Sequence, residues 1–198
     1  MRTLILVFLF LTAPIQLALA QLGTADVNQV SAECTRGEAQ SCLRLGLSYI
    51  LGRDGLVKDE NKATDLFKQS CEGGIAAGCE MLGTAYFQGR GVNPDKLRAL
   101  ELYQKACDGG RASACRFVGW MYHTGNGVPK DNFQAVEPLT RSCTGGEPMG
   151  CLMLSFMYQR GEGVRLDRAR ALDLAGKACD LKSEEGCTVY AKLKNQNR

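Results

Sequence analysis

The most informative stretch of this sequence, residues 79–115, reads CEMLGTAYFQGRGVNPDKLRALELYQKACDGGRASAC. Its first apolar residues keep the spacing of one helix face, at Cys79, Leu82, Gly83, Tyr86 and Phe87. Residues 89–95 interrupt the pattern with two glycines and a proline, and Asp95 is of the type that caps a following helix. Helical spacing then resumes and stops at Gly109-Gly110, because glycine adopts the left-handed conformation that ends helices. The stretch predicts helix, glycine loop, helix and glycine turn, without strands.

This pattern recurs along the chain with a constant period. The ten cysteines form five pairs, each eight residues apart: Cys34 and Cys42, Cys71 and Cys79, Cys107 and Cys115, Cys143 and Cys151, Cys179 and Cys187. Successive pairs follow at 37, 36, 36 and 36 residues, and Tyr49, Tyr86, Tyr122 and Tyr158 are in phase with them. A fixed period in this range is typical of a solenoid of stacked helical units.

We therefore predict an all-α fold, a right-handed α/α solenoid of about four 36-residue helix-loop-helix repeats with flanking half-repeats. The expected units cover residues 37–74, 75–110, 111–146 and 147–182. Capping helices are expected over residues 26–36 and 183–194. Because each unit contacts only its neighbours, residues 21–198 are expected to form a single domain.

Residues 1–20 resemble a cleaved secretory signal peptide. Arg2 gives a positive start, residues 4–11 are apolar, and Ala18-Leu19-Ala20 has the small residues that signal peptidases recognise. The apolar stretch is shorter than the ~20 residues that a membrane span needs. We expect a secreted or periplasmic protein that begins at Gln21 and has no stable membrane span.

Composition limits the partners and cofactors. The chain has 24 Lys and Arg against 21 Asp and Glu, an overall excess too small to indicate binding to nucleic acid or to an acidic membrane surface. A single His excludes a metal site of several histidines within a monomer, which is the expected state. No metal and no cofactor are therefore expected.

The repeat resembles the Sel-one-like repeat, a relative of the tetratricopeptide repeat. The resemblance is carried by Leu82-Gly83-x-x-Tyr86-x-x-Gly89-x-Gly91-Val92, with Ala99 and Ala106 following, and by the equivalent residues 118–128. A cysteine pair in every unit makes the chain similar to the cysteine-rich branch typified by the Helicobacter cysteine-rich proteins. Two residues depart from the pattern, because Ser155 replaces the glycine of the Leu-Gly pair and Pro138 lies inside a predicted helix. Pro138 is expected to bend that helix or to disturb its first turn.

The repeat also predicts how the cysteines pair. Each pair brackets the glycine turn between the second helix of one unit and the first helix of the next, so that antiparallel helices bring the two sulfurs together. We predict five local disulfides between the paired cysteines, in the order given above. Zinc sites prefer Cys-x(2–4)-Cys spacing and redox sites Cys-x-x-Cys, and neither spacing occurs in the sequence.

The sequence leaves two functions open. No Ser-x-x-Lys, Gly-x-Ser-x-Gly or Gly-x(4)-Gly-Lys motif is present, so no catalytic residue is assigned. The first hypothesis is that the protein is a repeat scaffold, which binds a protein or peptide along its concave groove. The resemblance implies the alternative, a weak β-lactamase that binds penicillin or peptidoglycan-derived fragments, because such activity is attributed to the cysteine-rich family.

The resemblance to tetratricopeptide repeats also implies which residues face the groove. In the second, third and fourth units the candidate binding residues are Glu80, Thr84, Phe87, Arg116, Trp120, His123, Phe156, Gln159 and Arg160. Trp120 is the only Trp and His123 the only His, and both share a helix face with Arg116. One interpretation is that this cluster binds an extended peptide or its carboxylate. The other is that Trp120 packs against the adjacent unit and His123 is a solvated residue at the rim.

Overall fold

The computed structural model describes residues 27–196, and every regular element within that range is a helix. An opening helix over residues 27–35 precedes nine helices of 13 residues each. These are α2 (Ala39–Leu51), α3 (Glu60–Glu72), α4 (Ala76–Gln88), α5 (Lys96–Asp108), α6 (Ala112–Thr124), α7 (Asn132–Thr144), α8 (Pro148–Arg160), α9 (Arg168–Asp180) and α10 (Glu184–Gln196). The predicted all-α fold is confirmed, whereas the predicted signal peptide lies outside the described residues.

Residues at the helix ends explain the constant helix length. The first helix of each unit ends at a glycine in the left-handed conformation, as at Gly89 with φ 70°. Each second helix starts after an aspartate whose carboxylate accepts a hydrogen bond from a backbone N–H of the first turn. In α5, for example, Asp95 accepts from the Arg98 N–H at 2.9 Å. The aspartates recur every 36 residues and the glycines every 36 or 37, so both signals are visible in the sequence.

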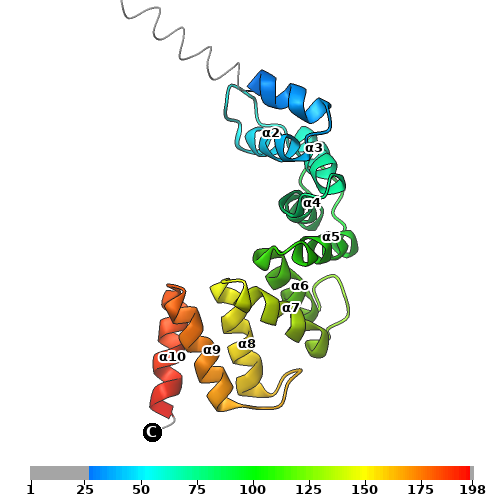
Figure 1. Ribbon diagram of the computed structural model, residues 1–198. Coiled ribbons are helices and arrows are strands. Elements are labelled where there is room, and N and C mark those ends of the chain that lie inside the picture. The colour runs from blue at the N-terminus through cyan, green and yellow to red at the C-terminus, as the bar shows by residue number, and fades with distance from the viewer. Residues whose placement is uncertain (1–26, 197–198) are drawn as a thin grey trace, which may run out of the picture.

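The helices stack in chain order and form a curved solenoid. The extensive helix contacts join consecutive helices, both within a unit, as between α4 and α5, and between units, as between α5 and α6. The stack bends into an open arc, and α4 lies on the inner side of the bend relative to α3 and α5 (Figure 1). The predicted solenoid of helix pairs is thus confirmed.

Glycine in the Leu-Gly pair lets the two helices of a unit approach closely. An added Cβ on Gly83 would lie 3.1 Å from the Tyr103 ring of α5. Ser155 stands at this position in α8 and is fully buried. Its hydroxyl donates a 2.7 Å hydrogen bond to the Ala171 carbonyl of α9, so the larger side chain is accommodated by pairing it.

All five predicted disulfides are present in the predicted order. Each joins the end of one unit to the start of the next across eight residues, with Cα atoms 4.3 to 4.7 Å apart. No cysteine is free among the residues that the structure describes. Every junction between successive units therefore carries a covalent link.

Neighbouring units also meet through their glycine loops. The loop between α4 and α5 rests on the first turn of α3, where a Cβ on Gly91 would clash with the backbone carbonyl of Glu60. Gly163 meets the Asn132 carbonyl in the same way. The loops therefore lie side by side along one edge of the solenoid.

Pro138 does not interrupt α7. This helix spans the same 13 residues as its equivalents and starts directly after its cap, Asp131. The Pro138 side chain is buried among the residues of α7 that face the interior. Packing therefore outweighs the loss of one backbone hydrogen bond at this position.

Candidate functional site

The nine predicted binding residues lie on three successive first helices. We call them the first-helix face: Glu80, Thr84 and Phe87 on α4, Arg116, Trp120 and His123 on α6, and Phe156, Gln159 and Arg160 on α8. Most of their side chains are half-buried, Glu80 is buried, and Arg160 is exposed. The face therefore combines residues that are fixed by packing with residues that solvent can reach.

Phe87 and Trp120 form the apolar centre of the first-helix face. Their rings belong to successive units and meet edge to face, with centroids 5.6 Å apart and planes at 68°. Both side chains pack against the main core yet stay partly exposed. The pair thus offers a rigid aromatic surface across the boundary between α4 and α6.

Arg116 is held by its own neighbours. Its guanidinium lies over the Phe117 ring at 4.2 Å, and its Nε lies 3.3 Å from a carboxylate oxygen of Glu147. Phe117 in turn stacks on Tyr103, with centroids 4.8 Å apart. Since a quarter of the Arg116 side chain is exposed, a ligand carboxylate would have to compete with Glu147 for it.

Glu80 is also paired. Only 6% of its side chain is exposed, and one of its carboxylate oxygens accepts from Nε of Arg111 and lies 2.7 Å from Nη2. Position 80 is equivalent to 116, and 111 to 147, because each pair is 36 residues apart. Adjacent unit boundaries therefore carry the same ion pair with the charges exchanged, Glu80 to Arg111 and then Arg116 to Glu147.

Thr84 links α4 to the interior. Its hydroxyl donates to the Glu80 carbonyl at 2.9 Å and accepts from the Tyr103 hydroxyl at 3.1 Å. Burial raises the pKa of the Tyr103 phenol above its ordinary value, so the phenol remains a hydrogen-bond donor at neutral pH. Two hydrogen bonds therefore fix the hydroxyl of this half-buried side chain.

His123 and Arg160 converge on the next loop. The His123 ring places Nδ1 3.0 Å from the amide oxygen of Asn132 and Nε2 3.8 Å from a carboxylate oxygen of Glu162. Nη1 of Arg160 lies 3.9 Å from the other oxygen of Glu162. Glu162 thus joins predicted residues from α6 and α8 into one polar group.

Phe156 and Gln159 lie towards the C-terminal end. Phe156 packs against the second core cluster, and the amide of Gln159 lies 3.4 Å from the Ser155 hydroxyl. Gln159 also lines a hollow of about 390 Å³ together with Arg168, Leu193 and Gln196. At its C-terminal end, the first-helix face therefore borders a mainly polar hollow that α10 helps to line.

Sequence reasoning missed Arg111, Glu147, Asn132 and Glu162, which complete these contacts. The 36-residue spacing of the two ion pairs was a usable signal for Arg111 and Glu147. Glu162 gave no such signal, because the equivalent loop residues are Arg90 and Asn126. No group of three His, Cys, Asp or Glu suited to a metal ion occurs within residues 27–196.

The repeat also matches a known family model. The Sel1 repeat model matches four segments, residues 39–75, 76–110, 112–146 and 148–183. The chain belongs to the Sel1 repeat family. No functionally curated protein is similar enough to this sequence to be matched to it.

Solved structures agree with this assignment. A protective antigen of uropathogenic Escherichia coli with an SLR fold is 27% identical, with a TM-score of 0.83 over 86% of this chain and 36% of the antigen. A Sel1 repeat protein from Oxalobacter formigenes is 26% identical, with a TM-score of 0.75 over 83% of this chain and 65% of that one. Cysteine-rich protein B of Helicobacter pylori is 29% identical, with a TM-score of 0.52 over 67% of this chain and 95% of that protein.

The chain thus spans about a third of the antigen and about two thirds of the Oxalobacter protein. As a Sel1 repeat protein it has the scaffold of a class whose repeats mediate protein interactions. The five disulfides and the likeness to a cysteine-rich Sel1 protein indicate a location outside the reducing cytoplasm. Among the described helices, none has the length and apolar character needed to cross a membrane.

Proposed function

We propose that this Sel1 repeat protein is a secreted or periplasmic scaffold that binds a protein or peptide segment along its first-helix face. The observation that carries the proposal is the Phe87 and Trp120 pair, two partly exposed rings fixed against each other on successive units. Aromatic side chains that are held rigidly lose little entropy on binding and dominate many protein interfaces.

The polar residues around this pair favour an extended peptide. Thr84 is on the same helix as Phe87, and His123 is on the same helix as Trp120 with Glu162 beside it. Arg160 is largely exposed and adds a positive charge one unit further on. An apolar side chain of the peptide would lie on the rings, while its backbone and acidic groups would meet the polar residues.

A displayed library of random 12-residue peptides tests this proposal. Peptides selected on the wild-type protein should lose affinity about thirtyfold with Trp120→Ala, since truncating an aromatic anchor costs about 2 kcal/mol. Arg160→Glu should weaken peptides that carry acidic residues, and this exposed change leaves the core intact. Lys68→Ala on the exposed side of α3 is the matched control.

Circular dichroism and thermal melts establish that each variant is folded. The proposal is wrong if the selected peptides bind Trp120→Ala and Arg160→Glu as tightly as they bind the wild type. It is equally wrong if the library yields no peptide that binds the folded protein.

The alternative function, hydrolysis of a β-lactam, has its support in the resemblance to the cysteine-rich family alone. Nitrocefin turnover by protein treated with a chelator would favour it, provided that a mock purification is inactive. Turnover lost with the chelator would be assigned to a contaminating metalloenzyme.

A further inference from the structure

Exposed apolar side chains gather on a second surface of the molecule. We call this surface the loop edge, meaning the four glycine loops with the first turn of each second helix: residues 52–62, 89–98, 125–134 and 161–170. Six large apolar side chains are exposed among the described residues, and four of them belong to the loop edge. These four are Val57 at 86% exposure, Leu97 at 60%, Phe133 at 79% and Leu166 at 53%.

The helices form equally well without a large apolar residue at the exposed positions. Leu97 and Phe133 are the second residues of α5 and α7, whereas Asn61 and Ala169 occupy the same position in α3 and α9. All four helices have the same length and the same aspartate cap. Single exposed apolar residues are ordinary, but one per unit along the same edge indicates a contact surface.

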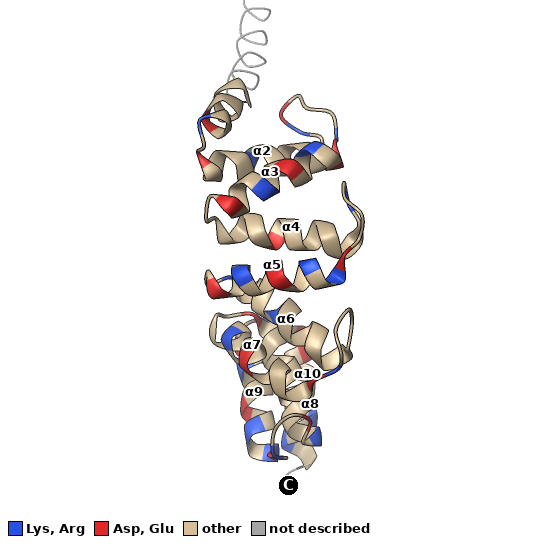
Figure 2. Ribbon diagram, turned by 90° about the vertical axis from the view of Figure 1, so that its right-hand side faces the viewer, with Lys and Arg blue, Asp and Glu red and all other residues tan. Residues whose placement is uncertain are grey.

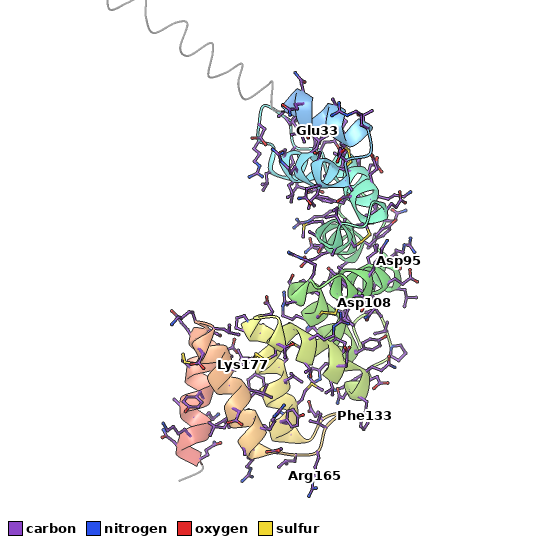
Figure 3. The ribbon with its side chains drawn as sticks, in the orientation of Figure 1. Glu33, Asp95, Asp108, Phe133, Arg165 and Lys177 are labelled. Carbon is purple, nitrogen blue, oxygen red and sulfur yellow. A yellow bond between two sulfur atoms is a disulfide. The ribbon has the colours of Figure 1, made fainter. Side chains whose placement is uncertain are left out.

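The four loops form one continuous edge. Gly91 and Gly163 each rest on the backbone of the second helix of the preceding unit, and Gly127 rests on the Lys96 side chain. Figure 2 shows the loops that follow α2, α4 and α6 one below another along one side of the stack. Phe133 and Arg165 both lie at the periphery of the molecule (Figure 3). The apolar side chains thus project outward at the loop edge.

The loop edge is also positively charged. It holds ten Lys and Arg against seven Asp and Glu, and four of those acidic residues are the helix-capping aspartates. Their carboxylates are already engaged with backbone N–H groups. Lys130 and Arg165 have no ion pair or hydrogen bond from their side chains within residues 27–196. Cations therefore flank the apolar row and are available to an anionic partner.

We propose that the loop edge docks on an anionic lipid surface. Apolar side chains that project from loops can enter the interfacial region of a bilayer, while neighbouring Lys and Arg meet the lipid phosphates. A hollow of about 820 Å³, with Val92, Leu97, Lys96 and the helix-capping Asp95 among its lining residues, leaves space for headgroups between the inserted side chains. An acidic peptide is a weaker match, because the two most exposed of the four side chains, Val57 at 86% and Phe133 at 79%, project from the edge into solvent.

Vesicle cosedimentation tests the proposal with the full chain. Vesicles of phosphatidylcholine with one third phosphatidylglycerol should bind the protein, whereas pure phosphatidylcholine should bind it at least tenfold more weakly. Raising the salt from 0.05 to 0.5 M should weaken binding to the anionic vesicles, because the Debye length falls several-fold. The double variant Leu97→Ser with Phe133→Ser should reduce binding at least tenfold, since each side chain no longer enters the apolar layer.

Met149→Ser is the matched control. Met149 is 40% exposed but lies at the start of α8, outside the loop edge, so this variant should bind anionic vesicles like the wild type. Because all variants share residues 1–26, differences between them report the loop edge and not the N-terminal segment. Trp120→Ala should leave vesicle binding unchanged, which separates this proposal from peptide binding by the first-helix face.

Three results would overturn the proposal. The first is binding to neither kind of vesicle, and the second is equal binding to both. The third is a double variant that binds anionic vesicles as well as Met149→Ser does. Retention of the wild type, but not of the double variant, on immobilised poly-glutamate without any vesicle binding would assign the loop edge to an acidic protein partner instead.

Discussion

At the scale of single residues, two separate features disfavour a side chain at some glycines. One is a positive backbone φ, and the other is close contact between the loop and a neighbouring helix. Gly91 and Gly110 both have positive φ, 65° and 86°, so an alanine at either position is strained. A Cβ on Gly91 would also clash with the backbone of Glu60, whereas Gly110 has open space around its Cα. The two positions therefore separate backbone strain from steric overlap.

We expect Gly110→Ala to lower the free energy of unfolding by about 1 kcal/mol, the usual cost of the left-handed conformation. Gly91→Ala should lower it by about 3 kcal/mol or more, because the loop must also move away from the preceding unit. Urea denaturation measures both values. Equal losses for the two variants would show that the loop does not rest on α3.

The Asp131 carboxylate, which caps α7, makes stability depend on pH. Hydrogen bonds from the backbone and side chain of Gln134 hold the pKa of Asp131 below its ordinary value. A lowered pKa in the folded state means that the stabilisation is complete above the unfolded value of about 4 and is lost as the pH falls through the folded value.

Asp131→Asn keeps an oxygen that can accept the same bonds but cannot titrate. We expect its free energy of unfolding to fall less between pH 5 and pH 2 than that of the wild type. Asp65→Asn, at an exposed position within α3 that caps no helix, is the control. Urea denaturation at a series of pH values measures the free energy of unfolding of each protein. If this free energy falls equally with pH in the wild type and in Asp131→Asn, the cap does not contribute to the pH dependence.

At the scale of helices, the two ion pairs give adjacent unit boundaries opposite charge arrangements. Glu80 is almost fully buried, so removing its partner Arg111 leaves a desolvated carboxylate without compensation. At the next boundary Arg116 and Glu147 occupy equivalent positions with the opposite polarity. A unit placed at the wrong boundary would bring like charges together.

We expect Glu80→Arg and Arg111→Glu each to lower the free energy of unfolding by about 2 kcal/mol. The double exchange should recover at least half of the combined loss, because it recreates the arrangement found one unit later. Thermal or urea denaturation of the four proteins gives the coupling energy. Additive losses in the double variant would mean that the pair does not interact.

The disulfides act at the junctions between helix pairs. Each closes a loop of about nine residues, which the chain-entropy estimate values at roughly 2–3 kcal/mol. Cys107→Ala with Cys115→Ala should lower stability by that amount and leave the helical circular dichroism largely unchanged. Complete loss of helicity would show that this bridge is needed for the units to form at all.

At the scale of the whole molecule, the sequence was sufficient for the architecture and insufficient for the contacts of the site. Periodic cysteines, tyrosines and glycines predicted the helices, their order and all five disulfides, because these depend on spacing along the chain. The partners of Arg116 and His123 depend on how one unit turns relative to the next. Glu162, which lies in the unit after His123, therefore became visible only in the structure.

The chain contains a single tryptophan, and it lies at the centre of the proposed binding surface. Fluorescence emission of the folded protein, titrated with a selected peptide that itself lacks Trp, therefore reports directly on the first-helix face. Covering the partly exposed ring should shift the emission to shorter wavelength, with a midpoint equal to the dissociation constant measured independently. A peptide that binds at that constant while the Trp120 emission stays unchanged would contradict binding at the first-helix face.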